Sequence, residues 1–127
     1  MSTELKRILY AEDEADIQNI VRISLEEIGG FDLKMCSSGE ELLESYEDFK
    51  PDLILLDVMM PGLSGVETYS ALKKKKAFIN TPVVFVTAKV QVNELQAYKE
   101  LGAIEVIDKP FNPMELPERL RQIWQDR

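Results

Sequence analysis

The chain has 127 residues, of which 45% are apolar and 30% charged, and its 15 basic and 23 acidic residues give a net charge of −8. This length corresponds to one domain, and the negative charge argues against direct binding to nucleic acid, whose phosphates would be repelled. The chain contains no histidine, which excludes serine–histidine and cysteine–histidine nucleophile pairs and histidine-ligated zinc.

The single cysteine and the short apolar runs limit the class of protein further. Cys36 is the only cysteine, so no intrachain disulfide or thiolate metal cluster can form. Residues 1–13 hold no long apolar region behind a basic start, and no run of 18 apolar residues occurs. We therefore expect a cytoplasmic protein with no membrane contact.

The first half of the chain alternates between predicted strands and predicted helices. In order, the apolar pattern predicts a strand over 8–11, a helix over 17–28, a strand over 31–36, a helix capped by Ser37 or Ser38, and a strand over 53–56. Gly29-Gly30 ends the first helix. The strand over 31–36 alternates only partly, as near a sheet edge, whereas 53–56 is apolar on both faces, as in a central parallel strand.

The second half continues this alternation. It predicts a loop over 59–65 with a type II turn, a helix over about 65–76 that closes with four lysines, a strand over 83–86, a helix that ends at Gly102, and a strand over 104–107. We expect the last helix to begin with Asn112 as its cap and Pro113 at its first position. Pro117 would then lie inside this helix and distort its first turns.

Five strands that alternate with five helices predict an α/β fold, a doubly wound (βα)5 parallel sheet covered on both faces. The order 2-1-3-4-5 of flavodoxin-like folds suits five strands. No linker interrupts the pattern, so we expect residues 1–127 to form a single domain with no effector domain present.

Polar residues follow the predicted strands at the edge where ligands bind in such sheets. Three acids, a hydroxyl and an amine meet there, from Glu12, Asp13, Asp57, Thr87 and Lys109. Two like charges ~4 Å apart cost ~4 kcal/mol at an effective dielectric of ~20, and a hard cation such as Mg²⁺ would offset this repulsion with oxygen ligands alone. A flavin phosphate is the alternative occupant, but the acidic loop after the first strand would repel it.

These residues resemble the receiver domain of two-component response regulators, the CheY-like superfamily, over nearly the whole chain. The motifs that carry the resemblance are Glu12-Asp13, Asp57 after two leucines, Met60-Pro61-Gly62 with Gly65, Thr87-Ala88 and Lys109-Pro110-Phe111.

The resemblance implies a phosphorelay protein that is not an enzyme acting on external substrates. Asp57 would accept a phosphoryl group from a sensor histidine kinase or a histidine phosphotransfer protein, and the domain would switch conformation and signal to a downstream protein target. Glu12, Asp13, Asp57 and the backbone carbonyl of Met59 would hold Mg²⁺.

The other implied roles concern contact with the phosphoryl group and the switch. Lys109 would contact the phosphoryl group, with its bond to Pro110 in the cis form, and the Thr87 hydroxyl would move toward it. Val106 stands where the family often has a switch aromatic, so we expect output to depend on Thr87 and the helix after it. A dimer through that helix, the fifth strand and the last helix is possible.

Two other classes of protein compete with this interpretation. A haloacid-dehalogenase-type phosphohydrolase would need a second acid two residues after its nucleophile, but Met59 stands there. A receiver-like scaffold that is never phosphorylated would not need the complete five-residue site.

Overall fold

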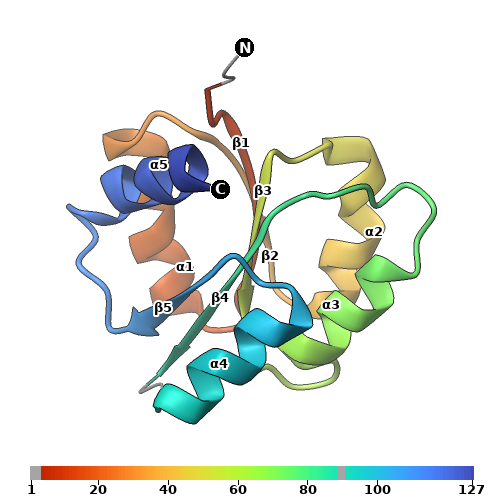
Figure 1. The fold of residues 1–127 in the computed structure, drawn as a ribbon. Helices are drawn as coiled ribbons and strands as arrows, with labels where there is room; N and C mark the ends of the chain where they lie inside the picture. Colours follow the sequence, from red (N-terminus) through yellow and green to blue (C-terminus); the bar gives the residue numbers. More distant parts are fainter. Residues whose placement is uncertain (1–3, 89–90) are drawn as a thin grey trace.

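The structure, a computed structural model, describes residues 4–88 and 91–127 and consists of a parallel sheet between two layers of helices (Figure 1). The strands are β1 (Arg7–Ala11), β2 (Asp32–Cys36), β3 (Leu53–Asp57), β4 (Val83–Ala88) and β5 (Glu105–Lys109). Their order across the sheet is β2-β1-β3-β4-β5, and every neighbouring pair is parallel. The predicted doubly wound α/β fold and its strand order are confirmed.

The helices divide between the two faces of the sheet. They are α1 (Ala15–Arg22), the π-helix η1 (Ile23–Ile28), α2 (Gly39–Phe49), α3 (Gly65–Lys73), α4 (Val92–Leu101) and α5 (Leu116–Asp126). Helices α1 and α5 cover one face, and α2, α3 and α4 cover the other (Figure 1). None of these helices has the length and apolar composition needed to cross a lipid bilayer in the part of the chain that the structure describes.

Two apolar clusters, one on each face of the sheet, form the core. Leu53 and Leu55 of β3 enter the cluster under α1 and α5, whereas Ile54 and Leu56 enter the opposite one, because successive side chains of a strand point to opposite faces. All five residues of β3 are buried, while β2 is partly exposed. The predicted central and edge strands are thereby confirmed.

The first helix is less regular than its apolar spacing predicts. From Ile23 it continues as a π-helix, in which the Gly29 amide donates to the Ser24 carbonyl five residues back at 2.9 Å. The wider turn rotates the following residues away from the α-helical register. Val21, Ser24 and Leu25 are therefore buried, but the predicted apolar residue Ile28 is 44% exposed.

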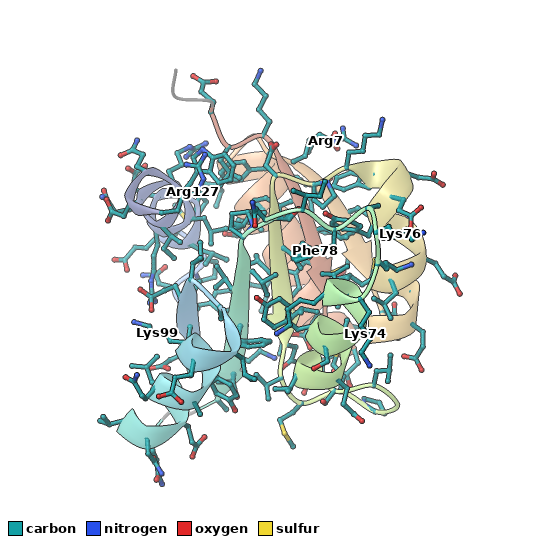
Figure 2. All side chains as sticks on the ribbon, turned by 45° about the vertical axis from the view of Figure 1, so that its right-hand side comes forward. Arg7, Lys74, Lys76, Phe78, Lys99 and Arg127 are labelled. Atoms are coloured by element: carbon teal, nitrogen blue, oxygen red, sulfur yellow. The ribbon has the colours of Figure 1, made fainter. Side chains whose placement is uncertain are left out.

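The predicted end of the third helix at residue 76 is wrong, since α3 ends at Lys73. The Lys74 and Lys75 amides bond three residues back, to Ala71 and Leu72 at 3.2 and 3.0 Å. The chain then turns, and the Phe78 ring packs 5.7 Å from the ring of Tyr46 and 6.5 Å from that of Tyr69. The turn leaves Lys74 and Lys76 exposed to solvent (Figure 2).

The predicted start of the last helix is also wrong. Asn112 closes a turn before it, because its side-chain oxygen accepts from the Met114 amide at 2.9 Å and its carbonyl accepts from the Leu116 amide at 3.0 Å. Helix α5 begins only at Leu116, so Pro117 is its second residue and not an interior one. A proline is tolerated there because the first amides of a helix have no partner within the helix.

Candidate functional site

Three charged side chains meet at the carboxyl edge of the sheet. Glu12 directly follows β1, Asp57 ends β3 and Lys109 ends β5. The Lys109 ammonium donates to Glu12 Oε1 at 2.8 Å and to Asp57 Oδ2 at 2.9 Å. The Glu12 side chain is fully buried and that of Asp57 is 4% exposed, so the lysine connects two carboxylates that have almost no contact with water.

The close packing of these charged groups shifts the pKa values of Glu12 and Lys109. Burial, with a smaller contribution from repulsion by Asp57, raises the pKa of Glu12 from its ordinary value of 4.5 to about 7, although the hydrogen bond from Lys109 opposes the shift. Burial alone would lower the pKa of Lys109, but its bonds to Glu12 and Asp57 raise it above its usual value. The lysine therefore stays charged and compensates only part of the acidic repulsion.

Asp13 adds a third carboxylate that the lysine does not neutralise. Oxygen atoms of Glu12, Asp13 and Asp57 all lie within 4.8 Å of one another. Asp13 Oδ1 is buried and has no hydrogen-bond partner among the described residues. A buried oxygen without a donor beside two further carboxylates fits a hard divalent cation, and Mg²⁺ prefers this kind of ligand.

The remaining predicted residues lie at the same edge but are joined to the acids less directly. The Met59 amide donates to Asp57 Oδ1 at 3.2 Å, while the direction of its carbonyl toward the acids stays a prediction. Thr87 is buried in β4, and its hydroxyl makes no hydrogen bond within the described ranges. The Lys109-Pro110 bond is cis, as the resemblance implied. The loop after Thr87 includes residues 89–90, which lie outside the described residues.

A close approach of α3 to the end of β3 fixes the loop that carries Asp57. The Gly65 amide donates to the Val58 carbonyl at 3.0 Å, and a Cβ at Gly65 would collide with the backbone of Asp57 and Val58. Only glycine fits at this position. Ser64 begins α3 in a reciprocal capping box with Glu67, so the loop is held at its far end as well.

Two features beside this site were not predicted from the sequence. The Tyr10 hydroxyl is fully buried on the same face of β1 as Glu12 and has no partner in the described chain, and burial raises its pKa well above the usual value. An apolar groove of about 430 Å³ lies beside Lys109, between α1 and the β5–α5 segment. Its lining residues are Ile17, Ile20, Ala88, Lys109, Pro110, Phe111 and Pro113. The only part of the sequence that could have predicted the groove was Pro110-Phe111, which directly follows Lys109.

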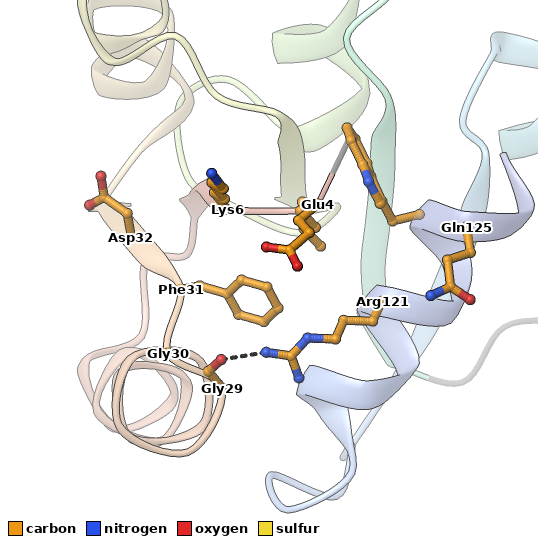
Figure 3. A pocket seen from close by; sticks show the side chains of 10 residues that line it. Glu4, Lys6, Gly29, Gly30, Phe31, Asp32, Arg121 and Gln125 are labelled. Carbon is orange, nitrogen blue, oxygen red and sulfur yellow. Dashed lines mark hydrogen bonds between the residues drawn. The ribbon is translucent and has the colours of Figure 1, made fainter. Parts of the chain in front are cut away.

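A larger cavity, of about 590 Å³, lies at the opposite edge of the sheet and contains none of the predicted site residues (Figure 3). Arg121 crosses it, donating to the Gly29 carbonyl at 2.5 Å with its guanidinium 4.6 Å from the centre of the Phe31 ring. The contacts of Arg121 join α5 to the end of η1, which is a packing role.

Comparison with known proteins agrees with this geometry. Residues 8–121 match the response regulator receiver domain family. The chain is 39% identical over 118 residues to the alkaline phosphatase synthesis transcriptional regulatory protein PhoP of Bacillus subtilis, covering 93% of this chain and 48% of that protein. It is 36% identical over 118 residues to the phosphate regulon transcriptional regulatory protein PhoB of Pseudomonas aeruginosa, covering 93% and 51%. The chain thus spans about half the length of the curated relatives it matches.

Solved structures show the same relationship. The chemotaxis protein CheY4 of Vibrio cholerae superposes with a TM-score of 0.85 at 27% identity, covering 94% of this chain and 98% of that one. The receiver domain of the Francisella response regulator 1452 gives 0.84 at 28% identity, covering 95% and 98%. The chain belongs to the receiver domain family of two-component response regulators, CheY-like signalling domains whose family function is to accept a phosphoryl group.

Proposed function

We propose that Asp57 is the phosphoacceptor and that it takes its phosphoryl group from a phosphohistidine of a sensor kinase or of a histidine phosphotransfer protein. The observation that carries this proposal is the partly buried Lys109 ammonium, 2.9 Å from an oxygen of Asp57, whose neighbour Asp13 has an oxygen with no hydrogen-bond partner among the described residues. A nucleophilic carboxylate, a fixed cation and free oxygen ligands are the groups that phosphoryl transfer requires.

In the transfer step, a carboxylate oxygen of Asp57 forms a bond to phosphorus while the phosphorus–nitrogen bond of the phosphohistidine breaks. The leaving imidazole nitrogen keeps the electron pair of that bond and takes up a proton. Lys109 stabilises the negative charge on the phosphoryl oxygens from the β5 side. The phosphoryl group therefore ends on a side chain of the protein itself and not on an external substrate. The proposed location of this reaction is the cytoplasm.

The metal site completes this arrangement. Glu12, Asp13, Asp57 and the Met59 carbonyl are the groups proposed to hold Mg²⁺, which when bound neutralises charge on the transferring oxygens. Asp13 is the proposed ligand whose oxygen has no other partner in the part of the chain that the structure describes. Lys109 already satisfies one oxygen each of Glu12 and Asp57, so these two residues share their carboxylates between the lysine and the ion.

The output would pass through Thr87 and α4. The Thr87 hydroxyl has no partner in the described chain and is therefore available to a phosphoryl group. In α4, all of whose residues are described, no side chain is fully buried, and only Leu95 and Tyr98 pack against the core, so a shift of this helix disturbs few core contacts. Val106 is already buried in the core and offers no aromatic ring to rotate. A dimer through α4, β5 and α5 stays a prediction.

The phosphodonor is proposed to be a protein that covers the groove beside Lys109. A phosphohistidine reaches Asp57 only if its protein rests on the carboxyl edge of the sheet, and the groove supplies apolar surface there. Ile20 on its rim is 43% exposed. MtrA of Mycobacterium tuberculosis is described as a DNA-binding response regulator. For this domain, the net charge of −8 favours protein partners over nucleic acid.

Intact-mass spectrometry after incubation with acetyl phosphate tests the proposal. We expect one added phosphoryl group on the wild-type protein in the presence of Mg²⁺, none without Mg²⁺, and none on Asp57→Asn. An adduct that persists in Asp57→Asn would contradict the assignment of the acceptor. If no adduct forms, the same proteins are titrated with beryllofluoride, and the absence of NMR shifts at Thr87 and α4 would favour a scaffold that is never phosphorylated.

A further inference from the structure

Ser24 is a buried polar residue that the phosphorylation site does not use. It is fully buried in the π-helix η1, among side chains that pack against α5 and the sheet. Its hydroxyl donates to the carbonyl of Pro113 at 2.6 Å, across 89 residues of sequence. This bond joins the first helical segment to the segment between β5 and α5.

The Pro113 carbonyl depends on this bond because of Pro117. The amides of Leu116 and Arg119 donate to carbonyls four residues back, before the start of α5, and an amide at position 117 would reach the Pro113 carbonyl in the same way. Proline has no amide hydrogen, and no backbone group in the described chain donates to the Pro113 carbonyl. Ser24 supplies the donor that the sequence of the β5–α5 segment lacks.

The two segments joined by this bond form opposite walls of the groove beside the acceptor. Ile17 and Ile20 of α1 form one wall, and Pro110, Phe111 and Pro113 form the other. Lys109, which holds Asp57 and Glu12, directly precedes the second wall. The Ser24–Pro113 hydrogen bond therefore connects the two walls of the groove. Ser24 itself is buried within the π-helix η1.

We propose that Ser24 is a positioning residue that sets the groove for the leaving group of the phosphodonor. The inference rests on the proposed function, because it assumes that a donor reacts at Asp57. Without the hydroxyl, the 110–115 segment separates from α1, and a donor whose leaving group contacts the groove reacts more slowly. A donor with a leaving group too small to reach the groove does not sense the change.

Amide hydrogen exchange of Ser24→Ala tests the anchoring itself. We expect exchange at the amides of Met114, Glu115 and Leu116, each of which donates a hydrogen bond to Asn112, to rise by about tenfold, because the Pro113 carbonyl loses its donor and this segment opens locally. Thr68→Val is the matched control. Thr68 is equally buried, and its hydroxyl also donates to a backbone carbonyl, that of Ser64, at 2.7 Å, but within α3. A uniform rise across the core in both variants would overturn the proposal.

Two small phosphodonors test the effect on the reaction. Monophosphoimidazole has an imidazole leaving group, as phosphohistidine does, whereas phosphoramidate releases only ammonia. For Ser24→Ala we expect the second-order rate constant with monophosphoimidazole to fall roughly three- to tenfold and that with phosphoramidate to change by less than about twofold. Thr68→Val should change neither rate constant. Equal losses with both donors would contradict a role in the groove.

Pro117→Ala offers a rescue that a merely structural role does not predict. Alanine at position 117 provides an amide that reaches the Pro113 carbonyl, so Ser24→Ala should cost less in this background, and the exchange and donor effects should both shrink. If the effects of Ser24→Ala on exchange and on the rate constants are unchanged in this background, Ser24 does not act through the Pro113 carbonyl. If neither donor labels the wild-type protein, the proposed function fails, whereas the exchange result still decides the anchor.

Discussion

The charged side chains at the two edges of the sheet differ in how completely their hydrogen-bonding groups are paired. At the amino edge, Asp52 accepts from the Lys6 and Arg7 amides at 3.0 and 2.9 Å, and the Arg7 side chain donates to the Phe49 carbonyl and to Asp32. At the carboxyl edge, by contrast, Asp13 Oδ1 has no hydrogen-bond partner within the described residues. There the one lysine that holds two acids leaves the pKa of Glu12 at about 7.

The degree of hydrogen bonding distinguishes polar groups that stabilise the fold from polar groups that can bind a ligand. A folded chain normally satisfies its buried polar atoms, as the amino edge does, although that edge also has the larger cavity. Unsatisfied and crowded groups are retained where they bind something. In this domain, incomplete satisfaction of charge therefore marks the site better than cavity volume.

The largest expected effect comes from Lys109→Ala at the carboxyl edge. Removing the cation that faces Asp57 should slow phosphorylation by acetyl phosphate by about 10²–10³-fold, because charge on the phosphoryl oxygens is no longer stabilised. The measurement is a time course of intact mass in the presence of Mg²⁺. Arg121→Ala at the amino edge is the control and should change the rate by less than about twofold; comparable losses in both variants would remove the distinction between the edges.

The pH dependence of stability should also distinguish the carboxyl edge. Because the pKa of Glu12 is raised from 4.5 to about 7 in the folded chain, the folded state binds more protons than the unfolded state between these values. The metal-free protein should therefore lose stability from this group as pH rises from about 4.5 to 7, by up to about 3 kcal/mol. Urea unfolding across this range measures the slope.

Glu12→Gln isolates this contribution, since glutamine does not titrate. The difference in unfolding free energy between the wild type and Glu12→Gln should change with pH in the stated direction. A constant difference from pH 4.5 to 8 would show that Glu12 ionises normally in the folded chain.

A smaller effect is expected at the amino edge from Asp52→Ala. The substitution leaves the Lys6 and Arg7 amides without their acceptor and should lower the free energy of unfolding by about 1–2 kcal/mol, with no effect on phosphorylation. Asp52→Asn keeps an acceptor oxygen and should cost clearly less. Urea denaturation provides the comparison, and a phosphorylation defect in Asp52→Ala would mean that the two edges are coupled.

The smallest effect is expected from Tyr10→Phe. The hydroxyl is buried and has no hydrogen-bond partner among the residues described, so its removal should raise the free energy of unfolding by about 1 kcal/mol, the reverse of the change at Asp52. Thermal and urea unfolding measure this gain. A loss of stability would mean that the Tyr10 hydroxyl is hydrogen-bonded in solution.

The fold could be predicted because its elements follow local rules. The run 53–56 is apolar at every position, which is typical of a strand covered on both faces, and β3 is indeed fully buried. The ends of helices were less predictable. The lysines after residue 73 favour a helix locally, but the packing of Phe78 against Tyr46 and Tyr69 ends α3 earlier.

The sequence could predict which residues lie at the site, but not which hydrogen bonds they make with one another. Parallel strands bring their carboxyl ends to one edge, so Glu12, Asp57 and Lys109 were expected at the same edge. Because β4 lies between β3 and β5, the contact of Lys109 with both acids did not follow from this rule. Which acid lacks a partner depends on where one lysine places its three hydrogens, and no spacing rule encodes that. The bond from Ser24 to Pro113 spans 89 residues and could not be read from either local pattern.

The sequence by itself determined the alternation of strands and helices and the five residues that follow the strands at the carboxyl edge, because hydrophobic period and strand direction are local properties. The strand order was expected only from the few arrangements that doubly wound sheets adopt. Only the tertiary structure decided how the charges of the five residues are shared. Lys109 satisfies Glu12 and Asp57, whereas oxygens of Asp13 and Tyr10 have no hydrogen-bond partner within residues 4–88 and 91–127. The physical reason is that desolvation and hydrogen-bond geometry depend on every group packed around a charge, and those groups come from distant parts of the chain.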